Sequence, residues 1–229
     1  MQQKRNPSRP QSGESGNVIF FILLGIALIG LVTAALRSGG SESANIDAEQ
    51  MVIKVSQVQQ NASALARATE VAYQNVREES AISFAHPDAH SDYGTYGTTP
   101  SAEVFHVQGG GADYLDPPAG INDGTAWQFY GTTAAPDVGT DAADLIAVLP
   151  NVTPEFCTAM NKSLGQLGAT NDTGTCVYDS SGVRFSGVFA VAPNTMDGSS
   201  FTFTPAPQAC VTCTGAGNTQ HFYKVILAR

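Results

Sequence analysis

The stretch ANIDAEQMVIKVSQVQQNASALARATEVAYQNVREESAISF, residues 44–84, contains no glycine and no proline. Apolar residues recur along it at spacings of three or four, which places them on one face of a helix. Polar residues, among them Gln57, Gln60 and Arg67, occupy the opposite face. The pattern predicts an amphipathic helix over about 44–80 whose apolar stripe packs against another part of the fold. The residues of the stripe are Ile46, Met51, Val55, Val58, Ala62, Leu65, Ala68 (or Ala66) and Ala72.

An uncharged apolar run of 19 residues, 18–36, precedes this helix. Its length matches the roughly 20 residues that cross a bilayer core. A cleavable export signal has a shorter apolar core, about 7–15 residues, followed by small residues at the cut. Thr33 and Ala35 leave that alternative open. Three basic residues precede the run and only Arg37 follows it closely, so the positive-inside rule predicts a cytoplasmic N-terminus and an extracytoplasmic remainder.

The chain beyond Arg37 is acidic. It carries seven basic and 19 acidic residues, a net formal charge of −12. A surface of that sign repels nucleic acid and anionic lipid headgroups, so we expect no nucleic-acid partner. Charged residues are sparse while Gly, Thr, Ser and Ala are plentiful, which favours a β-rich exported domain over a cytosolic enzyme.

Turn-forming residues dominate from residue 86 onward and separate short β-like runs, as in an antiparallel sheet. One short helix is expected at 153–165, because Thr153 suits the N-cap, Pro154 the first helical position and Gly165 the stop. We therefore predict an α+β fold, in which a long N-terminal helix packs on a C-terminal antiparallel sheet. The first half of that helix would span the membrane and the second half would be amphipathic. The expected strands are 103–107, 126–131, 175–179, 183–191, 200–204 and 221–227.

All four cysteines, Cys157, Cys176, Cys210 and Cys213, lie in the last third of the chain. An even number outside the cytoplasm predicts two disulfides. Three pairings are possible, and proximity in sequence favours Cys157–Cys176 and Cys210–Cys213. The C-x-x-C spacing of CVTC is also found in redox and zinc sites, but here it lies among Pro, Thr and Gly without a second ligand pair. A tight loop closed by a disulfide is the favoured interpretation.

Signals for catalysis are weak, and we expect neither an enzyme nor a resident cofactor or metal. No nucleophile elbow, zinc-protease motif or phosphate loop occurs. The HPDAH segment brings His86, Asp88 and His90 together in sequence, yet it lies in a loop without a fourth ligand. The GGG at 109–111 is better explained by a sharp turn. Aspartates in the loops are candidates for a hard cation without the EF-hand spacing: Asp88, Asp92, Asp113, Asp116 and Asp123.

The aromatic residues Trp127, Phe129 and Tyr130 lie in one expected strand. They are candidates for a binding patch, but aromatic residues of an alternating strand are more often divided between core and surface. The core interpretation is favoured.

The layout resembles that of type IV pilins and the pseudopilins of type II secretion: a basic leader, a glycine before an apolar helix, an amphipathic extension and a β-rich domain with cysteines near its end. The resemblance implies cleavage by a prepilin-type peptidase after Gly16, which would leave Asn17 as the new N-terminus. Gly13 is a poorer match. The chain departs from the family at the fifth residue after the cut, where Phe21 replaces the usual glutamate.

The resemblance also implies that copies of residues 17–36 bundle into a filament core. Gly30 and Ala34 have the small-x-x-x-small spacing that lets helices approach closely. The expected domains are a cytoplasmic leader 1–16, a transmembrane and polymerisation helix 17–37, an amphipathic helix 38–85 and a globular domain 86–229. The candidate assembly residues are Phe20, Phe21, Gly25, Ala27, Gly30 and Ala34.

The sequence thus predicts a structural subunit of a pilus-like or pseudopilus filament. It would be a homo-oligomer that starts in the inner membrane, with a prepilin-type peptidase and assembly machinery as partners, and it would reach the cell surface once assembled. The alternative is a single-pass anchored protein whose extracytoplasmic domain binds a ligand or partner through its aromatic and acidic loops. A plain secreted protein or an exported enzyme is the least favoured interpretation.

Overall fold

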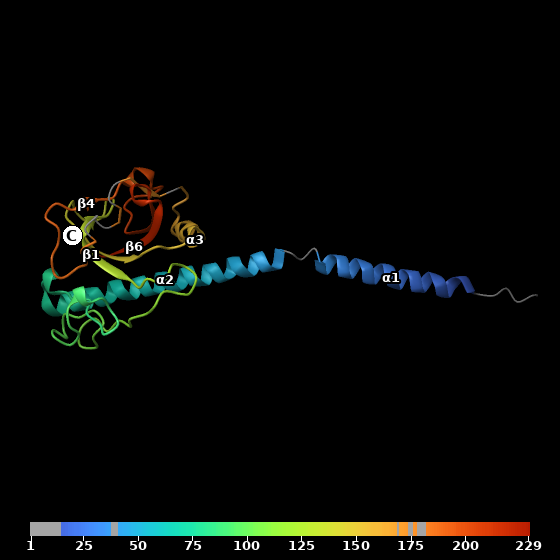
Figure 1. Cartoon of the computed structure of the whole chain (residues 1–229), viewed down its shortest axis with the longest axis horizontal. Helices are drawn as coiled ribbons and strands as arrows, with labels where there is room; N and C mark the ends of the chain where they lie inside the picture. The colour runs from blue at the N-terminus through green and yellow to red at the C-terminus, as the bar shows by residue number, and fades with distance from the viewer. Residues whose placement is uncertain (1–14, 38–40, 169, 174–175, 178–181) are drawn as a thin grey trace, which may run out of the picture. The chain divides into compact units, whose positions relative to one another are not determined.

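The protein has an α+β fold with three α-helices and a six-stranded mixed sheet in the part of the chain that its computed structural model describes (Figure 1). The chain divides into two compact units, Met1–Glu49 and Gln50–Arg229. The structure describes the backbone of residues 15–37, 41–168, 170–173, 176–177 and 182–229. Within these ranges it describes the side chains of residues 20–33 and of those from 47 onward.

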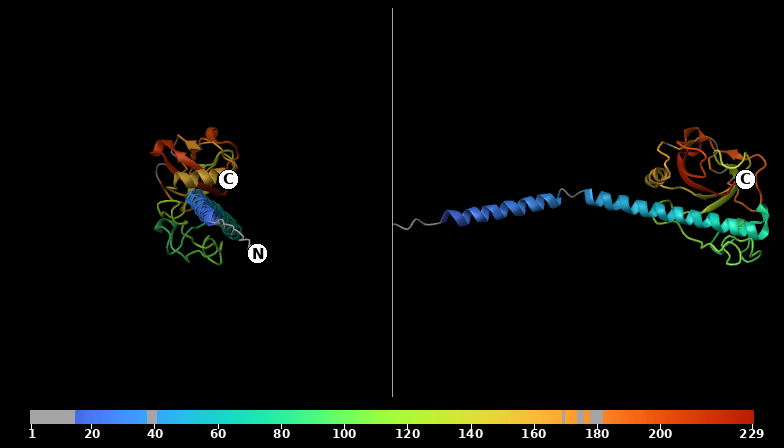
Figure 2. Two further views of the ribbon diagram at one scale, coloured as in Figure 1. Left: turned by 90° about the vertical axis from the view of Figure 1, so that its right-hand side faces the viewer. Right: turned by 180° about the vertical axis from the view of Figure 1, so that it is seen from behind.

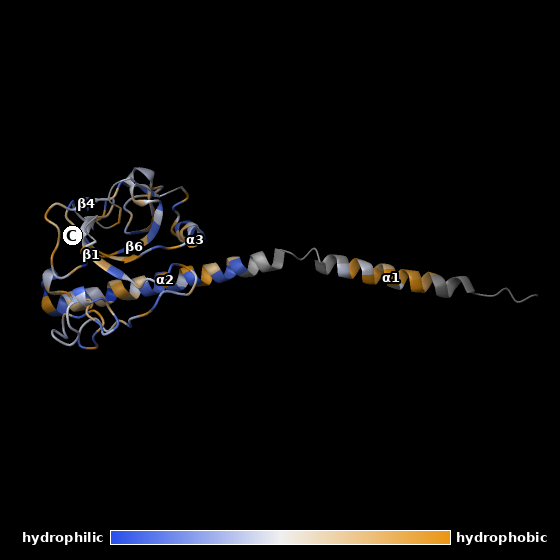
Figure 3. Cartoon of the chain, viewed as in Figure 1, coloured by the Kyte–Doolittle hydropathy of each residue, from blue (hydrophilic) through white to orange (hydrophobic). Residues whose placement is uncertain are grey.

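The first unit contains helix α1, Ser15–Arg37, and the beginning of helix α2, Ser41–Val76. Large apolar side chains cover every side of the described part of α1, since five consecutive ones at 20–24 are all exposed. The coloured turns of α1 are correspondingly almost all apolar in Figure 3. Among the helices and parts of helices that the structure describes, none combines the length and the apolar character needed to cross a membrane.

Helix α2 carries the predicted stripe into the core of the second unit. Val55, Val58, Ala62, Leu65, Ala68 and Ala72 are buried, and Met51 packs beside them. The prediction of an amphipathic helix is confirmed over these positions, whereas the side chain of Ile46 lies outside the described residues. The helix ends at Val76, because Arg77 adopts a left-handed conformation with φ of 57°.

The sheet has the strand order β3-β5-β6-β2-β1-β4. Its four central strands pair antiparallel, whereas the two-residue edge strands β3 and β4 pair parallel to β5 and β1. The prediction of a purely antiparallel sheet is therefore wrong at both edges. The strands are β1 (Gln128–Ala134), β2 (Asp144–Leu149), β3 (Asn171–Asp172), β4 (Asn194–Thr195), β5 (Gln208–Cys213) and β6 (Thr219–Leu227).

Strand β2 was not predicted, because it is buried on both faces. Leu145, Ala147 and Leu149 face the core that contains α2, while Ile146 and Val148 face a second apolar cluster. A strand covered on both faces has a continuous apolar run instead of the alternation that identifies a half-buried strand. The expected strands 126–131 and 221–227 are confirmed as parts of β1 and β6.

Three expected strands are absent from the described residues, because their backbone groups bond elsewhere. Segment 183–191 lies along β1 through two bonds, Phe185 N–H to Phe129 C=O (2.8 Å) and Ala190 N–H to Gly131 C=O (2.9 Å). Between these two bonds the segment advances by five residues while β1 advances by only two, so the regular hydrogen-bond pattern of paired strands does not form. Residues 103–107 form turns apart from a single parallel bridge between Glu103 and Ser83, and the N–H groups at 202 and 203 donate to the Gln166 side chain. The expected strand 175–179 lies partly outside the described residues.

The predicted short helix is confirmed as α3, Pro154–Leu164. The Thr153 hydroxyl accepts a hydrogen bond from the Phe156 N–H (3.3 Å), as an N-cap does. Gly165 ends the helix in the left-handed conformation, with φ of 78°. Phe156 and Met160 of α3 are fully buried and join the same core as α2.

A coil segment, residues 77–127, covers the side of α2 opposite the sheet, as Figures 1 and 2 show. It contains the short 3₁₀ helices Glu79–Ala81 and Ser91–Tyr93. Phe84 stacks on Phe129 of β1 with ring centroids 3.8 Å apart, so the coil and the sheet share one core. Further 3₁₀ turns lie at Gly198–Ser200 and Thr214–Ala216.

The glycines 109–111 form the expected sharp turn and also permit close packing on α2. A Cβ added at Gly110 would lie 2.5 Å from the backbone oxygen of Ala68 in α2 and 2.5 Å from that of Val104. Contacts this short involve backbone atoms, which cannot rotate away. Only glycine therefore lets the coil approach the helix at this point.

We predict that Gly110→Ala lowers the free energy of unfolding by about 2–3 kcal/mol, because the coil must move away from α2. Gly168→Ala is the matched control, since its added Cβ would meet only ordinary contacts at 3.7 Å or more. Urea unfolding followed by the fluorescence of the single tryptophan, the buried Trp127, measures both variants. Equal stability of the two variants would contradict the close approach.

Candidate functional site

The two disulfides join Cys157 to Cys210 and Cys176 to Cys213, each with Cα atoms 5.3 Å apart. Two disulfides are confirmed, but the favoured pairing of sequence neighbours is wrong. Cys210 and Cys213 both lie in strand β5 instead of a tight loop. Three residues of an extended strand span about 10 Å, and the side chains at i and i+3 point to opposite faces, so these two cannot bond to each other.

The first disulfide fixes α3 on strand β5. A second link lies beside it: the Asn161 side chain donates to the Cys210 C=O and accepts from the Cys210 N–H, both at 2.8 Å. The amide thus satisfies both backbone groups of Cys210, as a neighbouring strand would. Asn161 is buried, so this pairing is protected from water.

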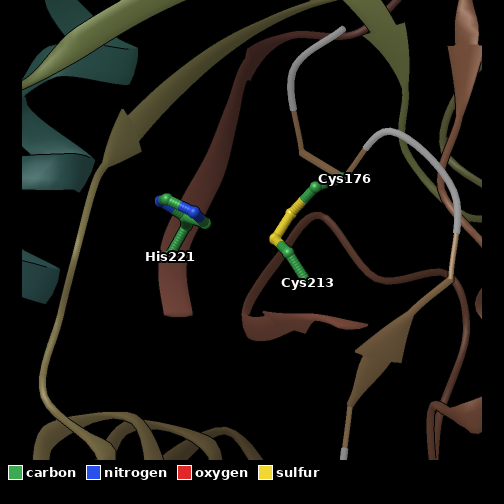
Figure 4. A group of neighbouring side chains, drawn as sticks. All are labelled: Cys176, Cys213 and His221. Carbon is green, nitrogen blue, oxygen red and sulfur yellow. A yellow bond between two sulfur atoms is a disulfide. The ribbon is translucent and has the colours of Figure 1, made fainter. Parts of the chain in front are cut away.

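The second disulfide lies close to His221 of β6, as Figure 4 shows. Cys176, Cys213 and His221 form the one group of three possible metal ligands in the described part of the chain, with ligand atoms within 4.8 Å of one another. The two sulfur atoms are bonded to each other, so neither is a thiolate. In this state the group offers a metal only the imidazole, which is too few ligands for a zinc site.

His221 is buried, and both ring nitrogens have polar neighbours. Nδ1 accepts from the Asn151 N–H at 3.3 Å, and Nε2 lies 3.1 Å from the Thr219 hydroxyl. Burial lowers the pKa of His221 from 6.5 to about 4, and the nearby Asp123 carboxylate opposes this shift only partly. The imidazole is therefore neutral at neutral pH and holds the turn before α3 against β6.

We predict that His221 makes the fold less stable as the pH falls from about 6.5 to about 4. In this window the unfolded chain binds a proton that the folded chain excludes, which costs up to about 3 kcal/mol below the folded pKa. His221→Gln should flatten the dependence of the unfolding free energy on pH. An unchanged slope in His221→Gln would contradict the assignment.

The HPDAH residues and the loop aspartates do not converge on one point. His86 and Asp88 are paired at 3.5 Å, while His90 pairs with Asp92 at 3.2 Å. Asp92 also bonds to Arg184 at 3.3 Å. None of them belongs to the ligand group described above. His86, Asp88 and His90 act in local contacts of the coil, while Asp92 also ties the coil to Arg184, a residue much later in the chain.

The aromatic residues of β1 and its approach are buried, which confirms the core interpretation for Trp127, Phe129 and Tyr130. Phe129 and Trp127 belong to the core that contains α2, whereas Tyr130 belongs to the cluster on the other face of the sheet. Trp127 packs edge-on against Phe222 with ring centroids 6.0 Å apart. One side of Trp127 still borders a groove.

That groove lies along α2 and has a volume of about 1110 Å³. One wall is the polar face of α2 from Ser56 to Arg67, the other is the coil from Asp113 to Pro118, and Val58 and Trp127 also line it. Its amide side chains are Gln57, Gln59, Gln60 and Asn61. Its charged side chains are Arg67, Asp113 and Asp116. We call this feature the α2 groove.

The coil wall of the α2 groove is anchored at both ends. Tyr114 stacks on His86 with ring centroids 4.6 Å apart and meets the edge of Phe105 at 5.2 Å. Burial, with Asp116 and Asp88 nearby, raises the pKa of Tyr114, so its hydroxyl stays neutral. At the other end Ile121 is fully buried, and its C=O accepts from the Thr153 N–H at 2.8 Å. The groove is therefore a fixed feature of the fold.

The sequence did not identify the α2 groove. The sequence predicts Gln57, Gln60 and Arg67 on the polar face of a helix, but nothing in their spacing shows that a coil folds back along that face. It offers Asp113 and Asp116 only as candidate cation ligands. The available signal was the high density of amides at 57–61, where four of five residues are Gln or Asn.

The residues predicted for processing and assembly lie in or beside α1. For Gly16, Asn17 and Ala34 only the backbone is described. Phe20, Phe21 and Ala27 are exposed. A Cβ added at Gly25 or Gly30 would meet nothing within 4 Å. Phe20, Phe21, Gly25, Ala27 and Gly30 are therefore open on the surface of α1.

Comparison with known proteins adds no assignment: the chain matches no family model, no curated protein and no solved structure.

Proposed function

We propose that the protein is a structural subunit of a pilus-like filament and that copies assemble through the apolar helix α1. Before assembly, the 19-residue run 18–36 would hold each copy in the membrane. The proposal depends chiefly on one observation, the exposure of apolar side chains on every side of α1. Phe20, Leu24 and Val32 are exposed by 61%, 46% and 57%. Seven further large apolar side chains of α1 are exposed to a similar degree.

A helix that is apolar all round requires apolar surroundings on all sides. An amphipathic helix such as α2 buries one face within its own fold, whereas α1 has no polar face to leave in water. A lipid bilayer satisfies α1 in a single copy, and a bundle of α1 helices satisfies it in an assembly. If α1 moved from the bilayer into a bundle of α1 helices, the same segment would serve first as the membrane anchor and then as the polymerisation surface.

Two further features favour assembly over a permanent anchor. Gly25 and Gly30 leave open space on α1, which lets the backbone of a neighbouring helix approach closely. Val52 and Ile53 of α2 are exposed by 62% and 57%, although Val55 and Val58 of the same helix are buried. Their apolar surface is available for contact with a neighbouring copy.

We predict that the protein isolated from its source organism begins at Asn17 and that surface fibres sheared from the cells contain it. The leader would be removed before assembly, because its charged residues would otherwise enter the apolar bundle. Gly16→Leu should block both processing and fibre formation, whereas Gly13→Leu should affect neither. Intact mass, N-terminal sequencing and electron microscopy of the sheared fraction provide the measurements.

A wild-type chain that retains its leader would contradict assembly by this route and favour the anchored binding protein. A chain that begins near Leu36 would contradict both, because the apolar run would then be an export signal.

A further inference from the structure

The α2 groove offers hydrogen-bonding groups of both kinds along three turns of helix. Side-chain amides such as those of Gln57, Gln60 and Asn61 each donate and accept hydrogen bonds, and the Ser63 hydroxyl, which donates to the Gln59 C=O, can still accept one. Sugar hydroxyls also donate and accept. The chemistry of this wall therefore matches a ligand that presents many hydroxyl groups.

The charge in the groove favours an uncharged ligand. Arg67 contributes one positive charge, and Asp113 and Asp116 contribute two negative charges on the facing wall. A phosphate or sulfate group would meet more negative than positive charge. The carboxylates and the guanidinium also suit neutral hydroxyls, because the former accept and the latter donates charge-assisted hydrogen bonds.

Apolar surface is present beside the polar groups. Leu115 is exposed by 51% on the coil wall, Pro118 lies near it, and Trp127 lines the groove between the coil and α2. The C–H face of a pyranose ring is apolar, so such surfaces bury it favourably. The amides and carboxylates of the groove can therefore bond to the hydroxyls of a sugar, while its few apolar side chains can cover the C–H face of the ring.

The dimensions favour a chain of sugars over a single small molecule. The wall from Ser56 to Arg67 rises about 16 Å along the helix axis. The volume, about 1110 Å³, exceeds the range of about 300–1,000 Å³ typical of pockets for drug-sized ligands. An open groove of this length leaves room for several linked rings.

We propose that the α2 groove is a binding site for a neutral oligosaccharide. A peptide fits the same surface less well. Extended peptides dock by adding a strand to a sheet edge, and helical peptides insert apolar anchors into an apolar groove. The walls here are a helix and a coil, and the helix wall is rich in amides. This site is independent of whether copies assemble through α1.

The test uses the full-length chain in a detergent without a sugar headgroup, because such headgroups would compete for the site. Maltohexaose, cellohexaose and chitohexaose serve as neutral probes. Titrations follow Trp127 fluorescence and saturation-transfer NMR of the sugar protons. We expect at least one hexaose to bind with a Kd of about 1 mM or tighter.

Gln60→Ala should weaken that binding at least about tenfold, the effect of losing roughly 1.4 kcal/mol of polar contact. Gln74→Ala is the matched control: the same residue type on the same helix, outside the groove and bonded to Glu70 at 3.0 Å. It should bind as the wild type does. Unfolding midpoints of both variants confirm that the fold is intact.

Failure of all three hexaoses to bind would overturn the proposal. Equal binding by Gln60→Ala and Gln74→Ala would also overturn it, because the sugar would then bind elsewhere. Both results leave the filament proposal untouched, since that is tested by processing and fibres.

Discussion

The burial of one face of α2 holds the second unit together. Its stripe from Val55 to Ala72 packs in one core with the sheet on one side and the coil 77–127 on the other. The backbone hydrogen bonds within the coil mostly close turns between residues near in sequence, whereas its apolar side chains Phe84, Val104 and Phe105 are buried in the core that α2 completes. The α2 groove exists because the same coil then runs along the polar flank of the helix.

Features of the fold that depend on neighbouring residues in the sequence are the ones that the sequence predicts correctly. The stripe of α2 and the caps of α3 were correct, because a helix satisfies its own backbone and displays its apolar face at a fixed period. Strand β2 is missed because burial on both faces removes the alternation, and β5 is mistaken for a loop because Pro, Thr and Gly surround its cysteines. The disulfide pairing depends on which strands and helices become neighbours, and spacing in sequence does not encode that.

The candidate sites were predictable to a lesser degree. His221 was visible as a histidine in an expected strand, but only the fold shows that it is buried beside the second disulfide. The groove joins α2 to a coil some 50 residues later in the chain. By contrast, the apolar character of α1 is contained in its own sequence. Helices α1 and α2 thus differ, because α2 buries its apolar face within its own fold, whereas the described large apolar side chains of α1 are exposed.

Contact between the α1 helices of neighbouring copies is tested most directly by disulfide cross-linking at Gly25. All four native cysteines are paired, and Gly25→Cys fits because a Cβ there meets nothing within 4 Å. Mild oxidation of surface fibres that carry this variant should convert the protein to disulfide-linked dimers on a non-reducing gel. Fibres in which the protein remains entirely monomeric after oxidation would contradict assembly through close contact of α1 helices.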